Sequence, residues 1–369
     1  MNVLHLTTHL NVGGITTYIY RLIKPLKKLG VETFVLSSGG NCSGEFTGHG
    51  AKTFELSIRT KNVLNPKIYF NLPAVKKIIL ENKIDLIHAH TRITQVMAFC
   101  LEKMTGVPFV TTCHGYYKRR IGRRLLPAWG KCAIAISDGV AEHLTRDFGL
   151  SESRVRLISN AVDLEELQSS FARHNAHDAK LSYGFKPGDP VIGSIGRLVA
   201  DKGHEYLIRA VPLLIPEFPS LRVLIVGDGP FRDELKELVR HLHLESHVVF
   251  TGSLKDITQA LAATDIFAFP ATWREGFGLS IVEAMACGKP VIVSNIWSLN
   301  TLIQDGVTGI LIPPKAIEPI TAAIKRLLNN KEERTRMSET GKAMVEKLFS
   351  IHRMAREIHD LYGKITQIS

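Results

Sequence analysis

The sequence predicts an α/β protein with two parallel-sheet domains. Its 369 residues are enough for two domains of ordinary size. Short apolar stretches alternate with amphipathic ones along the chain, which is typical of strands that alternate with helices in parallel sheets. A polar stretch from Glu165 to Pro190 contains Gly184, Pro187 and Gly188 and separates two such series, so we expect a linker there.

The composition narrows the class of protein. Hydrophobic residues make up 45% of the chain and its mean hydropathy is +0.06, which excludes a disordered protein. No apolar run reaches transmembrane length, and no basic and apolar leader opens the chain. The cysteines are scattered, odd in number and lack the spacing of zinc ligands, which indicates a reducing compartment. We therefore expect a cytoplasmic protein; the cysteines are Cys42, Cys100, Cys113, Cys132 and Cys287.

The positive charge is confined to one half of the chain. The net charge is +11, and residues 1–160 hold 22 Lys and Arg against 10 Asp and Glu. Residues 161–369 hold 24 against 25. The first half is therefore expected to face an anionic partner, such as lipid headgroups, an anionic acceptor or nucleic acid.

The first series opens with a predicted strand at 3–6, a turn at Gly13-Gly14 and a helix over 15–29. His88, His90 and His114 fall at the ends of later strands, where a parallel sheet binds its ligands. Each could contact a ligand or make a structural hydrogen bond. The remaining predictions are strands at 31–37, 84–90, 107–112 and 133–137, a helix over 73–82 and a glycine-rich loop over 39–50.

A basic and aromatic segment, Tyr116–Trp129, follows His114 directly. It could lie on a membrane surface, form a pocket for an anionic acceptor or be a solvated loop. Nucleic acid is not expected, because no known binding module accompanies it. Its basic residues are Lys118, Arg119, Arg120, Arg123 and Arg124.

In the second series, Arg197 follows a predicted strand and Lys202 precedes a helix that begins near His204. They could bind a diphosphate or be two surface cations. The sequence contains no Walker A motif, no zinc-ligand spacing and no Asp-x-Asp, so side chains and helix ends would have to neutralise a diphosphate. The strands of this series are predicted at 191–195, 221–226, 247–251, 266–269, 291–294 and 310–312, and helices at 231–241 and 351–365.

The stretch from Glu275 to Pro290 predicts a glycine loop that leads into an apolar helix. Free amides at such a helix start attract phosphate, and Glu283 could reach a polyol beside it. Alternatively, Glu283 only offsets the helix dipole and the glycines only make a turn.

Taken together, these motifs resemble the retaining glycosyltransferases of family four. The resemblance is carried by the Glu-x7-Glu stretch at 275–283, by residues 85–90, 112–115, 160–163 and 226–230, and by Gly13-Gly14, Gly196-Arg197 and Lys202-Gly203. It implies the GT-B architecture, in which two Rossmann-like parallel-sheet domains face an interdomain cleft. The implied domains are residues 1–165 for the acceptor, 166–349 for the nucleotide sugar, and a helix over 350–369 that returns to the first domain.

The resemblance also implies a function. The chain would move a sugar from a UDP- or GDP-linked donor to a glycan or lipid-linked acceptor, in bacterial cell-surface polysaccharide or glycolipid synthesis. It would need no cofactor and no obligatory metal, and it could bind the inner face of the cell membrane peripherally. The alternatives are a nucleotide-sugar 2-epimerase of the same fold and a non-catalytic nucleotide-sugar-binding protein.

Roles for individual residues follow from the same resemblance. The residues expected to act on the reacting groups are Arg197, Lys202, Glu275 and His114. Glu283 would bind the ribose, and residues 250–252 would meet the base. The complete set expected to bind the donor is Gly13, Gly14, Gly196, Gly227, Phe250, Thr251, Gly252, Gly276, Phe277, Gly278, Leu279 and Glu283.

Overall fold

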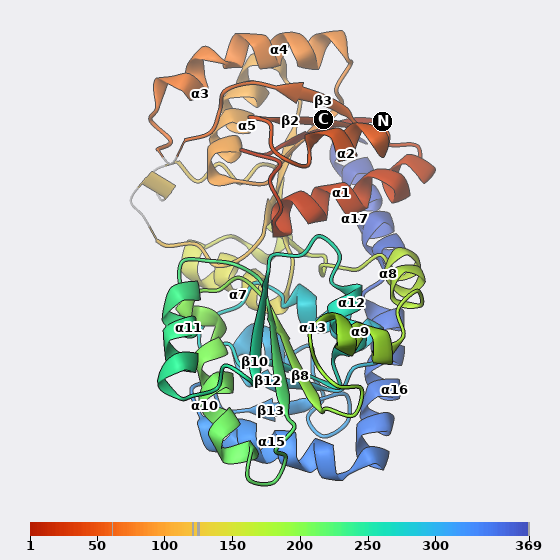
Figure 1. Ribbon diagram of the computed structural model, residues 1–369. Helices are drawn as coiled ribbons and strands as arrows, with labels where there is room; N and C mark the ends of the chain where they lie inside the picture. Colours follow the sequence, from red (N-terminus) through yellow and green to blue (C-terminus); the bar gives the residue numbers. More distant parts are fainter. Residues whose placement is uncertain (61, 120–121, 124–125, 368–369) are drawn as a thin grey trace. The chain divides into compact units, whose positions relative to one another are not determined.

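The computed structural model describes residues 1–367 apart from residues 61, 120, 121, 124 and 125 (Figure 1). The chain divides into two compact units. The first contains Met1–Asn160 together with the last helix, α17 (Ile351–Gln367), and the second is Ala161–Ser350. Within the described residues, one unit is built around a seven-stranded parallel sheet and the other around a six-stranded one. The predicted α/β class with two parallel-sheet domains is confirmed.

The sheet of the first unit has the strand order β3-β2-β1-β4-β5-β6-β7. From β1 the chain adds β2 and β3 on one side of β1, and it then adds β4 to β7 on the other side. The order reverses between β1 and β4, and the carboxyl ends of the strands on both sides of this switch point lie at the same edge of the sheet, as in doubly wound folds. The strands are β1 (Asn2–Leu6), β2 (Glu32–Ser37), β3 (Lys52–Glu55), β4 (Leu86–Ala89), β5 (Phe109–Cys113), β6 (Cys132–Ala135) and β7 (Val155–Leu157).

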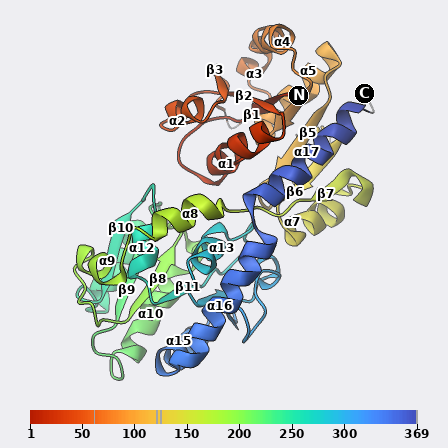
Figure 2. The ribbon, with the colours of Figure 1, turned by 90° about the vertical axis from the view of Figure 1, so that its right-hand side faces the viewer.

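Helix α17 belongs to the first unit although it ends the chain. It buries residues at helical spacing, including Met354, Ile358 and Tyr362, and packs against α1 (Gly14–Lys28) (Figure 2). Tyr362 reaches the sheet, where its hydroxyl lies 2.5 Å from Nδ1 of His88. The other helices of this unit are α2 (Ser43–Gly48), α3 (Pro66–Phe70), α4 (Leu72–Glu81), α5 (Arg92–Thr105) and α7 (Asp138–Glu142), which a π-helical turn (His143–Asp147) extends.

The second sheet has the order β10-β9-β8-β11-β12-β13, with β8 and β11 on the two sides of its switch point. Strands β8, β9 and β11 are almost entirely buried on both faces, as expected when helices cover both. The strands are β8 (Val191–Ile195), β9 (Arg222–Val226), β10 (Val248–Gly252), β11 (Ile266–Phe269), β12 (Val291–Ser294) and β13 (Ile310–Ile312).

Helices cover this second sheet on both faces (Figure 1). On one face, α10, α11 and α15 enclose an apolar core that includes Leu207, Leu235 and Ile324. Helices α12 and α13 contact the strands on the other face. The helices are α8 (Leu164–Phe171), α9 (Ala176–Ser182), α10 (His204–Leu214), α11 (Arg232–His241), α12 (Thr258–Ala263), α13 (Leu279–Ala286), α14 (Trp297–Asn300), α15 (Ile317–Asn329) and α16 (Lys331–Leu348).

The predicted linker at 165–190 is wrong. That stretch forms α8 and α9, both of which pack against α12, and the division between the units falls at Asn160–Ala161. Asp163 and Asn175 cap the two helices by accepting hydrogen bonds from backbone amides. The predicted loop at 39–50 is also only partly a loop, since α2 lies within it. Short helices with polar outer faces resemble loops in composition, which explains both errors.

Candidate functional site

The strongest candidate site in the second unit lies at the switch point of its sheet. Strand β8 ends at Ile195, and Gly196-Arg197 follow; β11 ends at Phe269, and the loop to Glu275 follows. These strands are neighbours in the sheet, and doubly wound sheets bind their ligands at the carboxyl ends of the strands at such a switch point. The structure therefore brings the loops that hold Arg197 and Glu275 to adjacent positions.

Glycines allow the backbone segments at this edge to approach one another closely. Gly227 has φ +139°, and a Cβ there would lie 1.9 Å from the carbonyl oxygen of Gly196. Gly203 has φ +69°, and its Cβ would lie 1.9 Å from the carbonyl oxygen of Pro270. Neither position accommodates a larger residue without movement of the backbone, so these glycines are structural requirements of the edge.

Lys202 and Glu275 meet across this switch point. The Lys202 ammonium donates a hydrogen bond to a carboxylate oxygen of Glu275, and each side chain is only about one-fifth exposed. The ammonium also lies 5.1 Å from the centre of the Phe269 ring. Ser298 donates a hydrogen bond to the backbone carbonyl of Glu275. The carboxylate is thus held in one orientation next to a positive charge.

Arg197 is exposed at the same edge, and among the described residues no hydrogen bond or ion pair involves its guanidinium. His204, directly after Gly203, is buried and bonds Ser194 at 3.1 Å. Burial, with a smaller contribution from Lys202, lowers the pKa of His204 to about 4. His204 is therefore neutral near pH 7, and the positive charge at this edge belongs to Arg197 and Lys202.

The predicted loop and helix after Glu275 are present. Gly278 caps α13 with φ +82°, and Ser280 in the first turn donates to the carbonyl of Ile195 at 2.9 Å. This bond fixes the helix start, with its free amides, beside the end of β8. Glu283 lies one turn further and is only 8% exposed. A carboxylate that merely offset the helix dipole would be expected in an exposed first turn, so burial argues against that alternative.

Of the other residues predicted to bind the donor, most lie at the carboxyl edge of the sheet or beside the start of α13, whereas the side chain of Phe277 is buried. Gly252 ends the edge strand β10 and accepts a hydrogen bond from the Gly227 amide at 2.9 Å, so residues 250–252 lie at the same carboxyl edge. Gly276 and Leu279 flank the α13 cap and are partly exposed. Phe277 differs from these, because its side chain is 3% exposed and packs edge-on against Phe349. Its ring stabilises the loop.

In the first unit, Gly13-Gly14 and His114 lie at the carboxyl ends of β1 and β5. Gly13 is extended, and a Cβ on it would meet only one atom within 4 Å, at 3.9 Å, while Gly14 would meet none. The protein's own packing therefore does not require either glycine. His114 bonds His90 at 3.1 Å. His90 also bonds His5, a buried residue that sequence reasoning missed because a lone histidine inside an apolar strand gives no signal.

Comparison with known proteins decides the family. The profile of glycosyl transferases group 1 matches residues 177–344, and that of glycosyltransferase family 4 matches residues 12–166. The chain belongs to the group 1 glycosyltransferases. It is 27% identical over 333 residues to the Escherichia coli UDP-Gal:alpha-D-GlcNAc-diphosphoundecaprenol alpha-1,3-galactosyltransferase, which covers 86% of this chain and 85% of that one.

Solved structures show that this glycosyltransferase has the GT-B fold. A glycosyltransferase from Rickettsia africae superposes with a TM-score of 0.88 at 24% identity, covering 100% of this chain and 99% of the other. The Anabaena protein HepE, solved in complex with UDP-glucose, gives 0.84 at 22% identity and covers 99% and 100%. The predicted family and fold are confirmed.

Within the basic segment of this glycosyltransferase, Arg123 is buried rather than exposed. Arg123 is 8% exposed, and its guanidinium stacks on Tyr117 at 4.0 Å and approaches Trp129 at 5.2 Å. Trp129 is itself 3% exposed, so neither residue is available to a membrane surface.

The other basic residues of the segment differ from one another. Arg119 pairs with Asp147 at 2.6 Å, and Lys118 is exposed. Arg120 and Arg124 lie outside the described residues. A cavity of about 780 Å³ borders the segment and is lined by Arg119, Arg123 and Arg154 among others. Across the described helices, none is both long and apolar enough to cross a membrane.

Proposed function

We propose that this glycosyltransferase is a retaining enzyme that transfers a sugar from a UDP- or GDP-linked donor to a glycan or lipid-linked acceptor. The observation that carries the proposal is the Lys202–Glu275 pair at the switch point of the second sheet, next to the start of α13. A carboxylate for sugar hydroxyls, a cation for phosphate and free helix amides are thereby gathered at one ligand-binding edge.

The diphosphate of the donor is held by Arg197, by Lys202 and by the amides at the start of α13. Arg197 can chelate two phosphate oxygens, and Lys202 has three N–H donors, so it can keep its bond to Glu275 while it binds phosphate. These groups also stabilise the charge that develops when the nucleoside diphosphate leaves. They perform this role without a divalent cation.

Glu275 binds hydroxyls of the transferred sugar, and Glu283 binds those of the ribose. During transfer the bond between the anomeric carbon and the phosphate oxygen breaks, and a bond to the acceptor oxygen forms on the same face. Because the new bond forms on the face from which the phosphate departs, the anomeric configuration is kept. The proton of the acceptor hydroxyl passes to the departing phosphate oxygen. Glu275 can orient the sugar throughout because Lys202 and Ser298 fix its position.

The acceptor is proposed to be a glycan or a lipid-linked sugar of the cell envelope. The Escherichia coli relative acts on a sugar carried by diphosphoundecaprenol, which is an anionic lipid-linked acceptor. An anionic acceptor also fits the excess of 22 Lys and Arg over 10 Asp and Glu in residues 1–160.

The test is a transfer assay with a panel of UDP- and GDP-sugars and lipid-linked or glycan acceptors. Thermal shifts identify the donor first, since ligand binding raises the melting temperature. We expect Glu275→Gln to lower kcat by about 100-fold or more while nucleoside diphosphate still stabilises the protein. The product should retain the anomeric configuration of the donor when examined by NMR.

Glu217→Gln is the matched control. Glu217 and Lys325 form another Lys–Glu pair of the second unit, at 2.9 Å, but Glu217 precedes β9 at the opposite, amino edge of the sheet. This variant should keep full activity. Transfer by Glu275→Gln at the wild-type rate would reject the residue assignment, and an inverted product would reject retention. Interconversion of a donor without any acceptor would favour an epimerase instead.

A further inference from the structure

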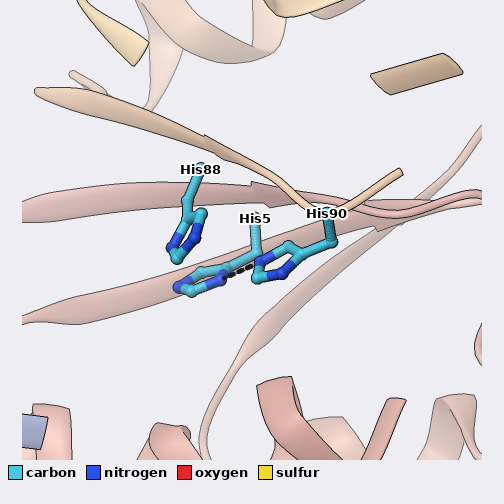
Figure 3. Close-up of side chains that lie close together, drawn as sticks. All are labelled: His5, His88 and His90. Carbon is cyan, nitrogen blue, oxygen red and sulfur yellow. Dashed lines mark hydrogen bonds between the residues drawn. The ribbon is translucent and has the colours of Figure 1, made fainter. Parts of the chain in front are cut away.

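Four histidines line up in the first unit, from the middle of its sheet to the carboxyl edge. His5 lies on β1, His88 on β4, His90 directly after β4 and His114 directly after β5. The first three are essentially inaccessible to solvent, and Figure 3 shows their rings packed together. His5 Nδ1 lies 3.0 Å from His90 Nε2, and His90 Nδ1 lies 3.1 Å from His114 Nε2. These contacts form a chain of hydrogen bonds that ends on His114.

The group formed by His5, His88 and His90 resembles a metal site at first sight, because one nitrogen from each ring lies within 4.8 Å of the others. However, His88 already bonds Tyr362 at 2.5 Å and Thr112 at 2.6 Å. Both nitrogens of His90 are also paired. An ion would have to break a hydrogen bond at each of these rings, and no described Asp or Glu joins the group to offset its charge. The hydrogen-bond chain explains the cluster better.

The three rings of the chain are neutral. Burial lowers the pKa of His5 and of His114 to about 3. It also lowers the pKa of His90 well below the ordinary value, with further contributions from the neighbouring His88, His5 and His114. Each neutral imidazole has one N–H and one lone pair, so the chain can be arranged in only two ways.

The two arrangements differ at the buried end of the chain. In the first arrangement His114 donates a hydrogen bond to His90, and His90 donates one to His5. The His5 Nδ1 atom is then an acceptor, so the His5 Nε2 atom must carry a hydrogen. That atom is buried and has no hydrogen-bond partner among the described residues, so its N–H would be unsatisfied. In the second arrangement His5 donates to His90 and His90 donates to His114. The His5 Nε2 atom then carries no hydrogen and is only an unpaired acceptor. Orphaned buried N–H groups are the rarer and costlier case, so the second arrangement is favoured.

We infer that His90 holds His114 as the neutral tautomer protonated at Nδ1, so that His114 offers a hydrogen-bond donor to its ligand rather than a base. His114 Nε2 accepts the bond from His90, and among the described residues nothing bonds Nδ1. His114 is a partly exposed residue at the end of β5, and its Nδ1–H then binds an acceptor oxygen, such as that of a sugar hydroxyl. His90 is a positioning residue. The identity of the ligand rests on the proposed function, but the tautomer does not.

The direct test is NMR on the full-length protein labelled with ¹⁵N-histidine, using long-range ¹H–¹⁵N correlations that distinguish protonated from bare ring nitrogens. His114 is assigned by its loss in His114→Asn. We expect a protonated Nδ1 and a bare Nε2 on His114 and on His90. A protonated Nε2 on His114 in the wild-type protein would overturn the inference, as would one equivalent of zinc bound to the purified protein.

Two matched variants separate positioning from packing. His90→Leu removes the donor to His114 Nε2, so His114 should shift toward the Nε2–H tautomer that a free histidine side chain prefers in water. His5→Leu only shortens the chain by one ring, and the same argument then leaves His90 Nε2 as the bare end. His114 should therefore keep its tautomer in that variant.

Activity gives a second readout. We expect kcat to fall by roughly threefold to tenfold more in His90→Leu than in His5→Leu, which corresponds to one neutral hydrogen bond. If His5→Leu changes the tautomer as much as His90→Leu does, the inference fails. The wild-type spectrum decides the matter even if His90→Leu does not fold. If the wild-type protein has the expected tautomer but no transfer activity, the proposed function is contradicted and the inference about the tautomer is not.

Discussion

Replacing Gly203 with alanine would test the geometry of the edge at which Lys202 and Glu275 meet. Gly203 lies between Lys202 and His204 and has φ +69°, a conformation that costs an alanine about 1 kcal/mol. The added Cβ would also lie 1.9 Å from the carbonyl oxygen of Pro270, where real contacts exceed 3.0 Å. Relief of that overlap requires the start of α10 to move away from the end of β11, and such backbone shifts cost about 1–3 kcal/mol.

The expected loss of stability is therefore about 2–4 kcal/mol for Gly203→Ala. Gly306→Ala is the matched control, because Gly306 has φ +72° in the same unit and no atom lies within 4 Å of its Cβ position. It should lose only about 1 kcal/mol. Urea unfolding measures both losses, and a transfer assay on the folded protein measures the consequence for Lys202.

The activity of folded Gly203→Ala should fall because Lys202, the preceding residue, moves relative to Glu275. Gly306→Ala should transfer sugar at the wild-type rate. Equal loss of stability in the two variants would refute the argument, since it would mean that the contact with Pro270 is not required. Full activity of Gly203→Ala would show that the two loops need not be held together for catalysis.

Two further predictions concern pH and metals. His204 has its pKa lowered to about 4 in the folded protein, against 6.5 when exposed, so below pH 6.5 the unfolded chain takes up a proton first. Stability should fall between pH 6.5 and 4 by about 1.4 kcal/mol per pH unit for this group. Urea unfolding of His204→Gln should show a shallower dependence, and an unchanged slope would contradict the assignment. Transfer should also survive EDTA, because Arg197 and Lys202 meet the charge of the diphosphate; loss of activity that Mg²⁺ or Mn²⁺ restores would contradict this.

The sequence predicted most of the central strands and failed at the edges of the first sheet and at the linker. Strands such as β4 and β8 are short apolar runs, and burial on both faces makes such runs visible in a sequence. The outer strands β3 and β7 have few buried residues, so neither was predicted. Helices α8 and α9 were taken for a linker, because only their packing against α12 distinguishes them from a polar loop.

The sequence predicted which residues form the candidate site, but it did not predict their contacts or their burial. The Glu275–Glu283 spacing and the order of the glycines indicated the loop and helix. They could not show that Ser280 fixes the helix start to β8, or that the ring of Phe277 is buried. The sequence also could not show that Arg123 of the basic segment is buried, with its guanidinium stacked on Tyr117.

The sequence by itself determined the alternation of strands and helices, the family and the types of residue available for binding a nucleotide sugar. These depend on local patterns and on motifs that keep their spacing. Only the tertiary structure decided which residues meet. Lys202 and Glu275 are 73 residues apart, and His88 and Tyr362 are 274 apart. The strand order brings the first pair together, and the packing of α17 in the first unit brings Tyr362 to His88. Both depend on the packing of whole helices and sheets. The direction of hydrogen-bond donation from His5 through His90 to His114 likewise follows from the burial of His5, and no local sequence pattern shows that burial.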